Sequence, residues 1–500
     1  MPLIEFLKTH PSYAFIFPEL WLTAAGLAMI FFDLFVRESR KTLIAWFGIA
    51  SLSLAAAFVI FPAPCDHRLV SAILKDMIAD DGFASFFKLV ILTGAFLVIV
   101  LSTRYVRLTS FTGEYYSLII LSTAAMMLLV SSVNLLMIYL CIEFVGICSY
   151  VLCAYHKDDP KSSEGAIKYL LLGALASAFL VYGISLLYGL TGSLNLIELP
   201  PRLAARETAG AGVVSLAVAL LVAAFGFKVA LVPFHMWSPD AYEGAPTPIT
   251  AFLSVLPKAA GIAVLTRVFL TAFSGVSSDW VHVLEVLAIL TMTIGNVTAV
   301  WQSNIKRMLA YSSIAHVGYV LIGVVVAGAL GVHSPLGRQG TAAVLIYVAA
   351  YLFMNLGAFA VVIAVSNAVG SDLIERCSGL SRRAPALAVL LTFFFLSLAG
   401  IPPTAGFIGK FFLFKAAIET EFYLLALAAI VNSVISVYYY WNVVRLMFIA
   451  EPPEPAPIRT PLPIAFALSL SAAAVLALGI LFQPLINLAS NGAIQTALLP

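Results

Sequence analysis

The stretch AAFGFKVALVPFHMWSPDAYEGAPTPITAFLSVLPKAAGIAVLTRVF, residues 223–269, places two lysines inside segments that are otherwise apolar enough to cross a membrane. Lys228 lies five positions before Pro233, and Lys258 directly follows Pro257. A charged side chain at the centre of a bilayer costs at least about 2.5–3.5 kcal/mol on insertion scales. Buried lysines beside prolines that interrupt their helices indicate a path for a small cation. The proton is the first candidate, because a buried lysine can titrate.

The composition is that of a polytopic membrane protein. Of the 500 residues, 62% are hydrophobic and 10% are charged, whereas an ordinary soluble chain has about 25% charged residues. There is no Gly-rich nucleotide loop, no Cys-x-x-Cys pair and no haem-type histidine pair, so we expect no cofactor or metal in this chain. The five cysteines are interpreted as inert packing residues. The N-terminus has no signal-peptide pattern, so the first span is expected to be retained.

Fourteen membrane spans are expected from runs of about 20 apolar residues, the length that crosses a bilayer. The fold class is therefore an all-α polytopic membrane protein. The expected spans lie near residues 13–36, 42–62, 83–103, 115–133, 134–156, 163–190, 211–232, 245–272, 280–301, 306–328, 341–369, 385–418, 421–449 and 460–487.

Lysine and arginine are unevenly divided between the loops that join these spans. The odd-numbered loops hold thirteen, whereas the N-terminus and the even-numbered loops hold six. Because cytoplasmic loops carry the positive excess, both termini are expected outside. The thirteen are Arg37, Arg40, Lys41, Arg104, Arg107, Lys157, Lys161, Lys306, Arg307, Arg376, Arg382, Arg383 and Arg459, and the six are Lys8, Arg68, Lys75, Arg202, Arg206 and Arg338.

The chain also reads as two copies of one unit. Pro233 interrupts the seventh span and Pro403 interrupts the twelfth, 170 residues later, and each lies near a buried lysine. Five spans separate the breaks, so the two copies enter the membrane from opposite sides, as in the inverted repeats of transporters. Pro233 is expected to free the Val229 carbonyl. Protein or water must satisfy such a carbonyl at membrane depth, which predicts a local water-filled pocket.

Glu143 and Lys228 are the first pair of candidate proton-transfer residues. Glu143 lies near the middle of NLLMIYLCIEFVGICSYVL, with no polar neighbour in sequence. It is either a carboxylate that a lysine satisfies for packing alone, or an ion partner that tunes the proton affinity of Lys228. The second reading rests on two opposed effects: a nearby carboxylate favours the charged lysine, and burial disfavours it. We expect the two groups within ion-pairing reach, directly or through a water.

Lys258, His316 and Lys410 are the remaining candidates. Lys410, in LAGIPPTAGFIGKFFLFKAAI, repeats at the second break the combination of a buried lysine and prolines. His316, in KRMLAYSSIAHVGYV, is either a satisfied core histidine or a proton carrier between the lysines, since its unperturbed pKa is about 6.5. We expect Lys228, Lys258, His316 and Lys410 to form a chain across the membrane plane, with waters in the longer gaps.

Four further polar residues have lesser expected roles. His235 either lines the outlet at the first break or bonds a free carbonyl, and Lys415 reaches toward the membrane interface. Glu19 and Asp33 in the first span are expected to contact a partner near the interface.

Several of these stretches resemble the antiporter-like membrane subunits of respiratory complex I. They are KVALVPFHMWSPDAYEGAPTPITAFLSVLPKAAG, KRMLAYSSIAHVGY and LAGIPPTAGFIGKF. CIEFVGICSYVL, followed by SSEGAIKYLLLGALASAFLVYGISLLYGLTG, is similar more narrowly to the branch called subunit N, which has counterparts in mitochondria and chloroplasts. The resemblance runs from about residue 115 to 450.

The resemblance implies two inverted five-helix repeats with broken helices 7 and 12, each repeat contributing half a proton channel. By residue number the parts are an N-terminal three-helix segment (1–113), the first repeat (114–272), the second repeat (273–450) and a C-terminal helix (451–500).

The family's functional residues carry over to four positions of this sequence. Glu143 becomes the carboxylate partner on span five, and Lys228 the titrating lysine on broken span seven. Lys258 becomes the connecting lysine on span eight, and Lys410 the terminal lysine on broken span twelve.

The implied function is that of a proton-translocating subunit of NADH-quinone oxidoreductase in a bacterial plasma membrane, in preference to an organelle inner membrane or a thylakoid. FMN, iron–sulfur clusters, NADH and quinone would be bound by partner subunits, with no redox centre in this chain. The implied partners are neighbouring antiporter-like and small membrane subunits and the lipid bilayer, with no nucleic acid.

Two other functions remain open from the residues. A subunit of a monovalent cation/proton antiporter would use the same fold and similar lysines. A sodium site, however, favours carboxylates and carbonyls, whereas the central axis of this chain offers lysines. A purely structural membrane scaffold would leave three buried lysines unexplained.

Overall fold

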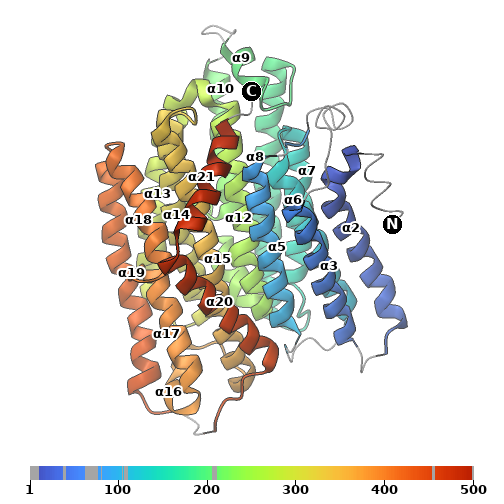
Figure 1. Ribbon diagram of the computed structural model, residues 1–500, viewed down its shortest axis with the longest axis vertical. Helices are drawn as coiled ribbons and strands as arrows, with labels where there is room; N and C mark the ends of the chain where they lie inside the picture. Colours follow the sequence, from blue (N-terminus) through green and yellow to red (C-terminus); the bar gives the residue numbers. More distant parts are fainter. Residues whose placement is uncertain are drawn as a thin grey trace.

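The computed structural model describes residues 11–37, 41–61, 77–79, 81–103, 105, 111–204, 211–452 and 456–497. Within them, thirteen helices are long and apolar enough to cross a membrane, and they form the bundle in Figure 1. Cys65 and the loop cations Lys8, Arg40, Arg68, Lys75, Arg104, Arg107 and Arg206 lie outside the described residues.

Thirteen of the fourteen predicted spans are single helices long and apolar enough to cross a membrane, and the twelfth is divided between two short helices. These are α17 (Pro385–Ala399) and α18 (Ala405–Glu419), each of which at about 1.5 Å per residue is too short to cross alone. The thirteen long helices are α2 (Pro11–Phe35), α3 (Thr42–Ile60), α5 (Gly82–Ser102), α6 (Thr112–Ser131), α7 (Leu135–Cys153), α8 (Pro160–Thr191), α10 (Ala211–Val229), α12 (Thr247–Ala272), α13 (Ser277–Val300), α14 (Ile305–Leu330), α15 (Pro335–Val369), α19 (Tyr423–Ile449) and α20 (Leu462–Ile480).

Shorter helices mark the two ends of the bundle and its C-terminal part. Helix α9 (Leu199–Ala204) lies at one end and α16 (Leu380–Arg383) at the other, which we call the α9 end and the α16 end (Figure 1). The last predicted span is followed by a separate helix, because α20 stops at Ile480 and α21 (Gln483–Ala497) then continues along α15 and α5.

The seventh span is broken as predicted, and its helix ends at a cap that precedes the proline. Helix α10 stops at Val229, four residues before Pro233, because Ala230 adopts the left-handed backbone conformation with φ 62°. The Leu231 N–H then bonds the Gly226 carbonyl at 2.7 Å, as in a Schellman cap. The helix therefore ends through its own C-cap before the proline is reached, and Val229 is its last residue.

The second break uses the same cap 170 residues later. Gly400 adopts the left-handed conformation with φ 88°, and the Ile401 N–H bonds the Leu396 carbonyl at 3.0 Å. Each of these positions follows its counterpart in the first break by 170 residues. Helices α10 and α17 approach their breaks from opposite ends of the bundle (Figure 1), as the halves of an inverted repeat are expected to do.

A pocket lies at Pro233, as predicted, and the water expected in it stays a prediction. A cavity of about 130 Å³ lies against Pro233 between α8 and α10, and side chains such as Leu175, Phe179 and Phe234 line it. One of the last carbonyls of α10, that of Phe227, is satisfied by the Trp237 indole N–H at 2.9 Å.

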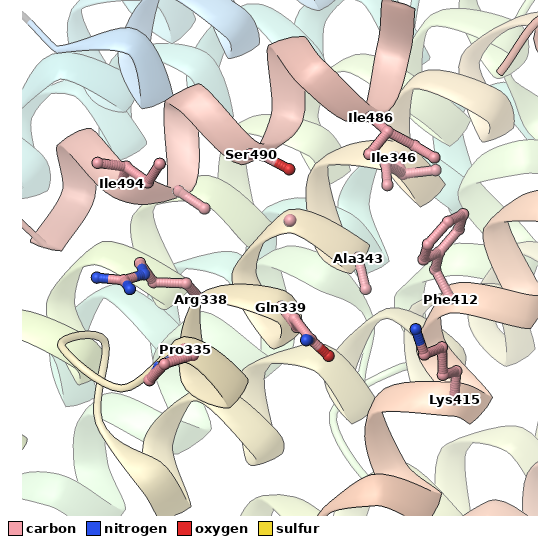
Figure 2. Close-up of a pocket in the computed structure, with 12 residues that line it drawn as sticks. Pro335, Arg338, Gln339, Ala343, Ile346, Phe412, Lys415, Ile486, Ser490 and Ile494 are labelled. Atoms are coloured by element: carbon pink, nitrogen blue, oxygen red, sulfur yellow. The ribbon is translucent and has the colours of Figure 1, made fainter. Parts of the chain in front are cut away.

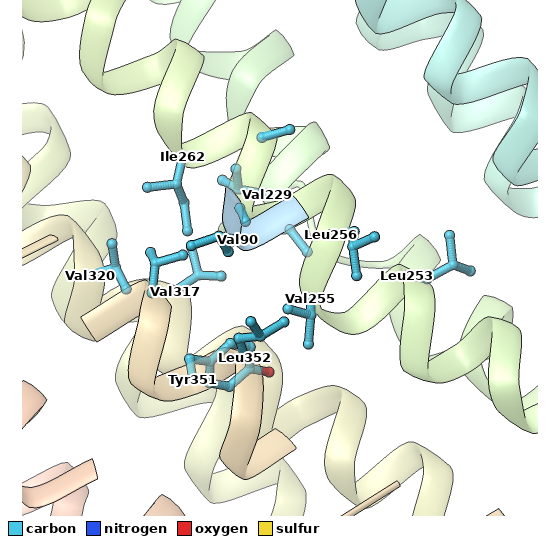
Figure 3. Close-up of a cluster of buried hydrophobic side chains, with 14 of the residues drawn as sticks. Val90, Val229, Leu253, Val255, Leu256, Ile262, Val317, Val320, Tyr351 and Leu352 are labelled. Atoms are coloured by element: carbon cyan, nitrogen blue, oxygen red, sulfur yellow. The ribbon is translucent and has the colours of Figure 1, made fainter. Parts of the chain in front are cut away.

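Helix α12 lies at the centre of the bundle, and its side chains from Thr247 to Leu270 are buried. Figure 3 shows its apolar side chains, including Val255 and Ile262, beside Val317 and Val320 of α14. Between helices in a bilayer, such contacts act through van der Waals packing. This apolar packing fixes the rotation of α12 and thereby the direction in which its polar residues point.

Pro257 leaves α12 continuous, because the carbonyl that it frees finds a partner. Proline lacks the N–H that would bond the carbonyl four residues earlier, which is that of Leu253. The Tyr242 hydroxyl donates to this carbonyl at 3.2 Å. Tyr242 belongs to α11 (Trp237–Gly244), the short helix after the first break, so the break itself supplies the missing hydrogen bond.

Two buried ion pairs attach α5 to its neighbours, and the sequence interpretation missed both. Arg267 of α12 donates to both carboxylate oxygens of Asp81 at 2.7 and 2.9 Å, and Asp81 also caps α5. Glu19 is ion-paired with Lys88 of α5 at 2.7 Å, and both side chains are buried. Glu19 therefore has an ion-pair partner inside the chain, and its expected place near the interface stays a prediction. Asp33 lies 3.6 Å from Lys41.

Changing Arg267 to methionine is expected to destabilise the chain by about 3–5 kcal/mol, because the buried carboxylate of Asp81 loses its counter-ion. Thermal unfolding of the purified complex that contains this chain would measure the loss. The double variant Arg267→Met/Asp81→Asn should recover part of it, since no unpaired charge remains. An unchanged melting temperature in the single variant would show that this pair is not needed for stability.

Candidate functional site

Lys228 and Glu143 lie on adjacent helices, but each has its own hydrogen-bond partner. Lys228, one residue before the end of α10, donates from Nζ to the Ile142 carbonyl of α7 at 3.1 Å. Glu143 follows Ile142, and its carboxylate accepts a hydrogen bond from the Ser177 hydroxyl of α8. In the part of the chain that the structure describes, no ion pair joins Lys228 to Glu143. The two groups are neighbours, as predicted, without the direct contact.

Two glycines make room for the polar groups of this first site. A Cβ atom at Gly146 of α7 would lie 3.5 Å from Lys228 Nζ, and one at Gly173 of α8 would overlap the Tyr150 hydroxyl oxygen. A side chain at Gly173 would thus displace Tyr150. Helices α7, α8 and α10 therefore approach closely enough for Glu143, Tyr150 and Lys228 to share one site.

Lys258 reaches from α12 to α14. Its Nζ donates to the Ser313 hydroxyl at 2.6 Å and lies 5.3 Å from the centre of the Tyr242 ring, close enough for a cation–π contact. Gly261, three residues after Lys258 and therefore on a neighbouring face of α12, faces Lys228, because a Cβ added there would lie 3.6 Å from the Lys228 Cγ. No hydrogen bond between the two ammonium groups occurs among the described residues.

His316 lies one turn after Ser313 on the same helix, with a tyrosine at each ring nitrogen. Its Nδ1 bonds the Tyr347 hydroxyl of α15, and its Nε2 lies 3.4 Å from the Tyr440 hydroxyl of α19. A cavity of about 10 Å³ lies between Lys258 and His316, which is about the space that one water needs. The structure thus brings His316 next to Lys258, with Ser313 and room for a water between them.

Lys410 completes this second group of polar residues. Its Nζ donates to the Ala399 carbonyl at 2.9 Å, and it lies 4.6 Å from the centre of the Tyr319 ring. Ala399 is the last residue of α17, so Lys410 satisfies a carbonyl that the second break leaves open. The Tyr319 ring also lies 5.7 Å from the His316 ring. Tyr319 therefore stands between His316 and Lys410.

The structure thus divides the five predicted residues into two adjoining sites, Glu143 with Lys228 and Lys258 with His316 and Lys410. The sequence interpretation missed the side chains that connect them. Tyr319 could have been found, because Ser313, His316 and Tyr319 recur every three residues on one helical face. The residues that were missed are Ser177, Tyr150, Tyr319, Tyr347 and Tyr440. His235 is buried in the first break, with its ring centre 6.5 Å from that of Tyr311.

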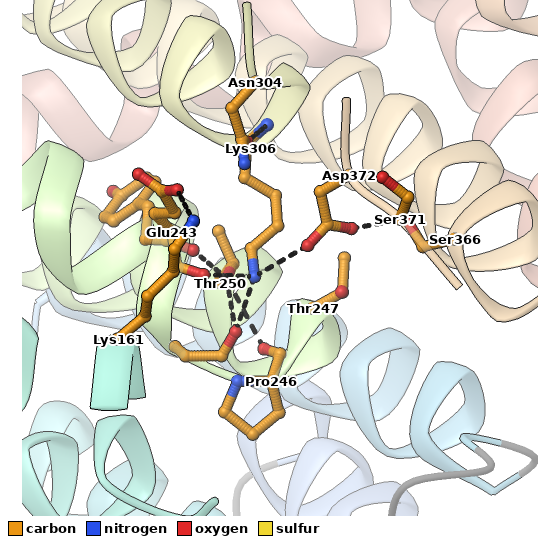
Figure 4. A network of polar contacts seen from close by, with 12 residues as sticks. Lys161, Glu243, Pro246, Thr247, Thr250, Asn304, Lys306, Ser366, Ser371 and Asp372 are labelled. Atoms are coloured by element: carbon orange, nitrogen blue, oxygen red, sulfur yellow. Dashed lines mark hydrogen bonds and ion pairs between the residues drawn. The ribbon is translucent and has the colours of Figure 1, made fainter. Parts of the chain in front are cut away.

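A network of charges at the α16 end fixes the helix that follows the first break. The buried ammonium of Lys306, at the start of α14, donates to the Glu243 and Ala245 carbonyls at 2.7 Å each and lies 3.5 Å from Asp372 (Figure 4). A cation beside the last carbonyls of a helix is stabilising. Lys306 therefore holds the C-terminal end of α11 against residues of the second half of the chain.

Asp240 of α11 is held in the same network from two sides. It accepts hydrogen bonds from Lys168 at 2.7 Å and from Arg307 at 2.6 Å. Burial by itself raises the pKa of Asp240, but these two cations outweigh burial and leave the pKa below its usual value. Asp240 therefore stays ionised at neutral pH, and α11 remains tied to both α8 and α14.

A family model and the curated relatives both relate most of this chain to NADH:quinone oxidoreductase. Residues 131–436 match the family described as NADH:quinone oxidoreductase/Mrp antiporter, TM. NADH-quinone oxidoreductase subunit N of Moorella thermoacetica is 43% identical over 480 residues, which cover 95% of this chain and 97% of that protein.

Two solved structures share the fold. A chain of respiratory complex I from Thermus thermophilus with bound aureothin is 31% identical, with a TM-score of 0.78 over 95% of this chain and 99% of that chain. A chain of the Mrp complex from Dietzia sp. DQ12-45-1b is 22% identical, with a TM-score of 0.82 over 97% of each chain, and this second likeness concerns the fold alone.

Proposed function

Since this chain belongs to the NADH-quinone oxidoreductase subunit N family, we propose that it is the proton-translocating, antiporter-like membrane subunit of a respiratory complex I. In this role it couples quinone reduction in partner subunits to proton transfer across the membrane. The observation that carries the proposal is the buried series Lys258, Ser313, His316, Tyr319 and Lys410, in which each polar group lies next to the following one.

The proposed proton path begins at Glu143 and Lys228 and ends at Lys410. A change in the distance between the Glu143 carboxylate and the Lys228 ammonium changes the proton affinity of the lysine, because the carboxylate favours the charged form and burial opposes it. In the present structure Ser177 and the Ile142 carbonyl hold the two groups apart. A movement of α7 against α10 is therefore sufficient to load or release a proton.

Lateral transfer then runs from the first repeat to the second. Lys258 passes a proton through Ser313 or one water to His316, and the Tyr319 side of His316 faces Lys410. In this proposal residues 114–272 and 273–450 each form half a channel, residues 1–113 form the N-terminal segment, and residues 451–500 contain the C-terminal helices. The matching caps at the two breaks support this division.

Electron transfer belongs to partner subunits in this proposal, which would bind FMN, iron–sulfur clusters, NADH and quinone. The names of relatives such as the Moorella protein include NADH and quinone. The chain contributes no redox centre and works as one membrane subunit among others. Its role in the enzyme is that of a translocase subunit.

The proposed location is a bacterial plasma membrane, with both termini outside. The cation-rich α16 end, which includes Lys306 and Arg307, then faces the cytoplasm. A cysteine at Ser334, in the loop before α15, should react with a membrane-impermeant maleimide from outside intact cells. One at Ser371, in the loop after α15, should react only in opened cells. The opposite labelling pattern would reverse the orientation.

The rival function is a subunit of a monovalent cation/proton antiporter. Proton pumping by membranes that contain the complex is expected to proceed at an unchanged rate when potassium replaces sodium, because the central residues are lysines and a histidine rather than sodium ligands. A requirement for sodium would favour the antiporter. Pumping that is unaffected by loss of Lys228, Lys258 and Lys410 would instead indicate a structural scaffold.

A further inference from the structure

A second cluster of basic side chains, Arg338 and Lys415, lies at the α9 end and takes no part in the proposed proton path. Helices α15, α18 and α21 enclose a cavity of about 310 Å³, within the usual range of about 300–1,000 Å³ for ligand sites. Figure 2 shows Arg338 and Gln339 of α15, Lys415 of α18 and Ser490 of α21 around this cavity. Three helices thus bring two cations and two neutral polar groups to one place.

The two basic side chains of this cavity have no acidic side chain beside them among the lining residues. Arg338 is half-buried, and its guanidinium has no ion pair or hydrogen bond with any of the described residues. Lys415 has one long ion pair, 3.6 Å to Glu419, a residue that does not line this cavity. No carboxylate is among the lining residues, and α21 contains no charged residue at all. A partly desolvated guanidinium without a partner is costly, so the cavity favours an anionic ligand.

The remaining walls distinguish a lipid from a soluble anion. Ile346 of α15, Phe412 of α18 and Ile486 of α21 border the same cavity. Inorganic phosphate gains nothing from such walls, whereas an acyl chain can pack against them as it packs against neighbouring lipids. The loops and helix ends at the α9 end hold few basic residues, and Arg338 is one of them. Basic residues are favoured in cytoplasmic loops, and the α9 end is the proposed outer end, so the positive-inside rule does not account for Arg338.

We propose that this cavity binds an anionic phospholipid, with the phosphate between Arg338 and Lys415 and an acyl chain along Ile346, Phe412 and Ile486. Lys415 also lines a neighbouring cavity of about 520 Å³ between α18 and α19 that extends to Lys410. The lipid phosphate therefore lies beside the mouth of the cavity that reaches the last lysine of the proton path. The proposal does not depend on the direction of proton transfer.

Photo-cross-linking of the intact complex tests the site directly. A photoactivatable phosphatidylglycerol is expected to label peptides from residues 335–346 or 486–494, and unlabelled phosphatidylglycerol should compete while phosphatidylcholine should not. The variant Arg338→Gln/Lys415→Gln should need about 30-fold more probe for equal labelling, since each cation near an anionic lipid is worth about 1 kcal/mol. Arg382→Gln, which removes an exposed cation from the α16 end, is the matched control and should label normally.

Three results would overturn the proposal. One is equal labelling of these peptides in the double variant and the native chain. Another is competition by inorganic phosphate as effective as that by phosphatidylglycerol, which would make the cavity a site for a soluble anion. The third is absence of labelling in the intact complex, as expected if a partner subunit covers the cavity. If the double variant does not assemble, Arg338→Gln alone should still weaken labelling about fivefold.

Discussion

Replacing Lys228 with arginine is expected to lower the number of protons translocated per electron at least about tenfold, given that a positioned proton carrier contributes about 10²–10⁴ in rate. Arginine keeps the positive charge but does not release a proton in proteins. Lys228 is the residue with a carboxylate neighbour, a broken helix and a position against α12, so its protonation links the two proposed sites. Quinone reductase activity should fall together with pumping if the two are tightly coupled.

The measurement is proton translocation per electron in membranes that carry Lys228→Arg, with Lys228→Ala alongside. Both variants should lose pumping. Because Lys228→Arg keeps the positive charge, its loss of pumping would show that the lysine must release a proton and not only carry a charge. Lys161→Arg, at an exposed lysine that pairs with Glu243, is the matched control and should pump normally. Subunit content must be equal in all preparations. A native ratio at a native rate in Lys228→Arg would refute the proposed mechanism.

Changing His316 to alanine is expected to reduce pumping about 100-fold or more, because it removes the one imidazole between Lys258 and Lys410. The small cavity beside His316 would grow, and a water chain in it would have to cross an apolar wall that includes Val317 and Val320. Quinone reduction measured with an uncoupler present should be less affected than pumping.

Variants of Tyr347 and Tyr440, the tyrosines at the two ring nitrogens of His316, should reduce pumping to different extents. Tyr347→Phe removes the short hydrogen bond to Nδ1, whereas Tyr440→Phe removes the weaker contact of 3.4 Å at Nε2. We therefore expect a larger loss of pumping from Tyr347→Phe than from Tyr440→Phe. Full pumping by His316→Ala would make His316 a core residue and would leave the lysines to transfer protons through water alone.

The spans, the broken helices and three of the buried lysines, Lys228, Lys258 and Lys410, could be predicted from the sequence, whereas the buried Lys88 was missed. A bilayer imposes a minimum length on each apolar run and a large cost on each charge within it, and both effects act on neighbouring residues. The 170-residue interval between Pro233 and Pro403 is likewise visible in the chain itself. These features were confirmed because no contact between distant segments is needed to recognise them.

The tertiary structure alone decided which partner each buried polar group has. Glu143 is bonded by Ser177, 34 residues away, rather than directly by Lys228, and Asp81 holds Arg267 across 186 residues. The Tyr440 that faces His316 is 124 residues distant in sequence. Such pairs depend on the rotation of each helix about its axis, which apolar packing around α12 sets. Charge in a sequence therefore predicts that a partner exists, and only the packed bundle determines which residue it is.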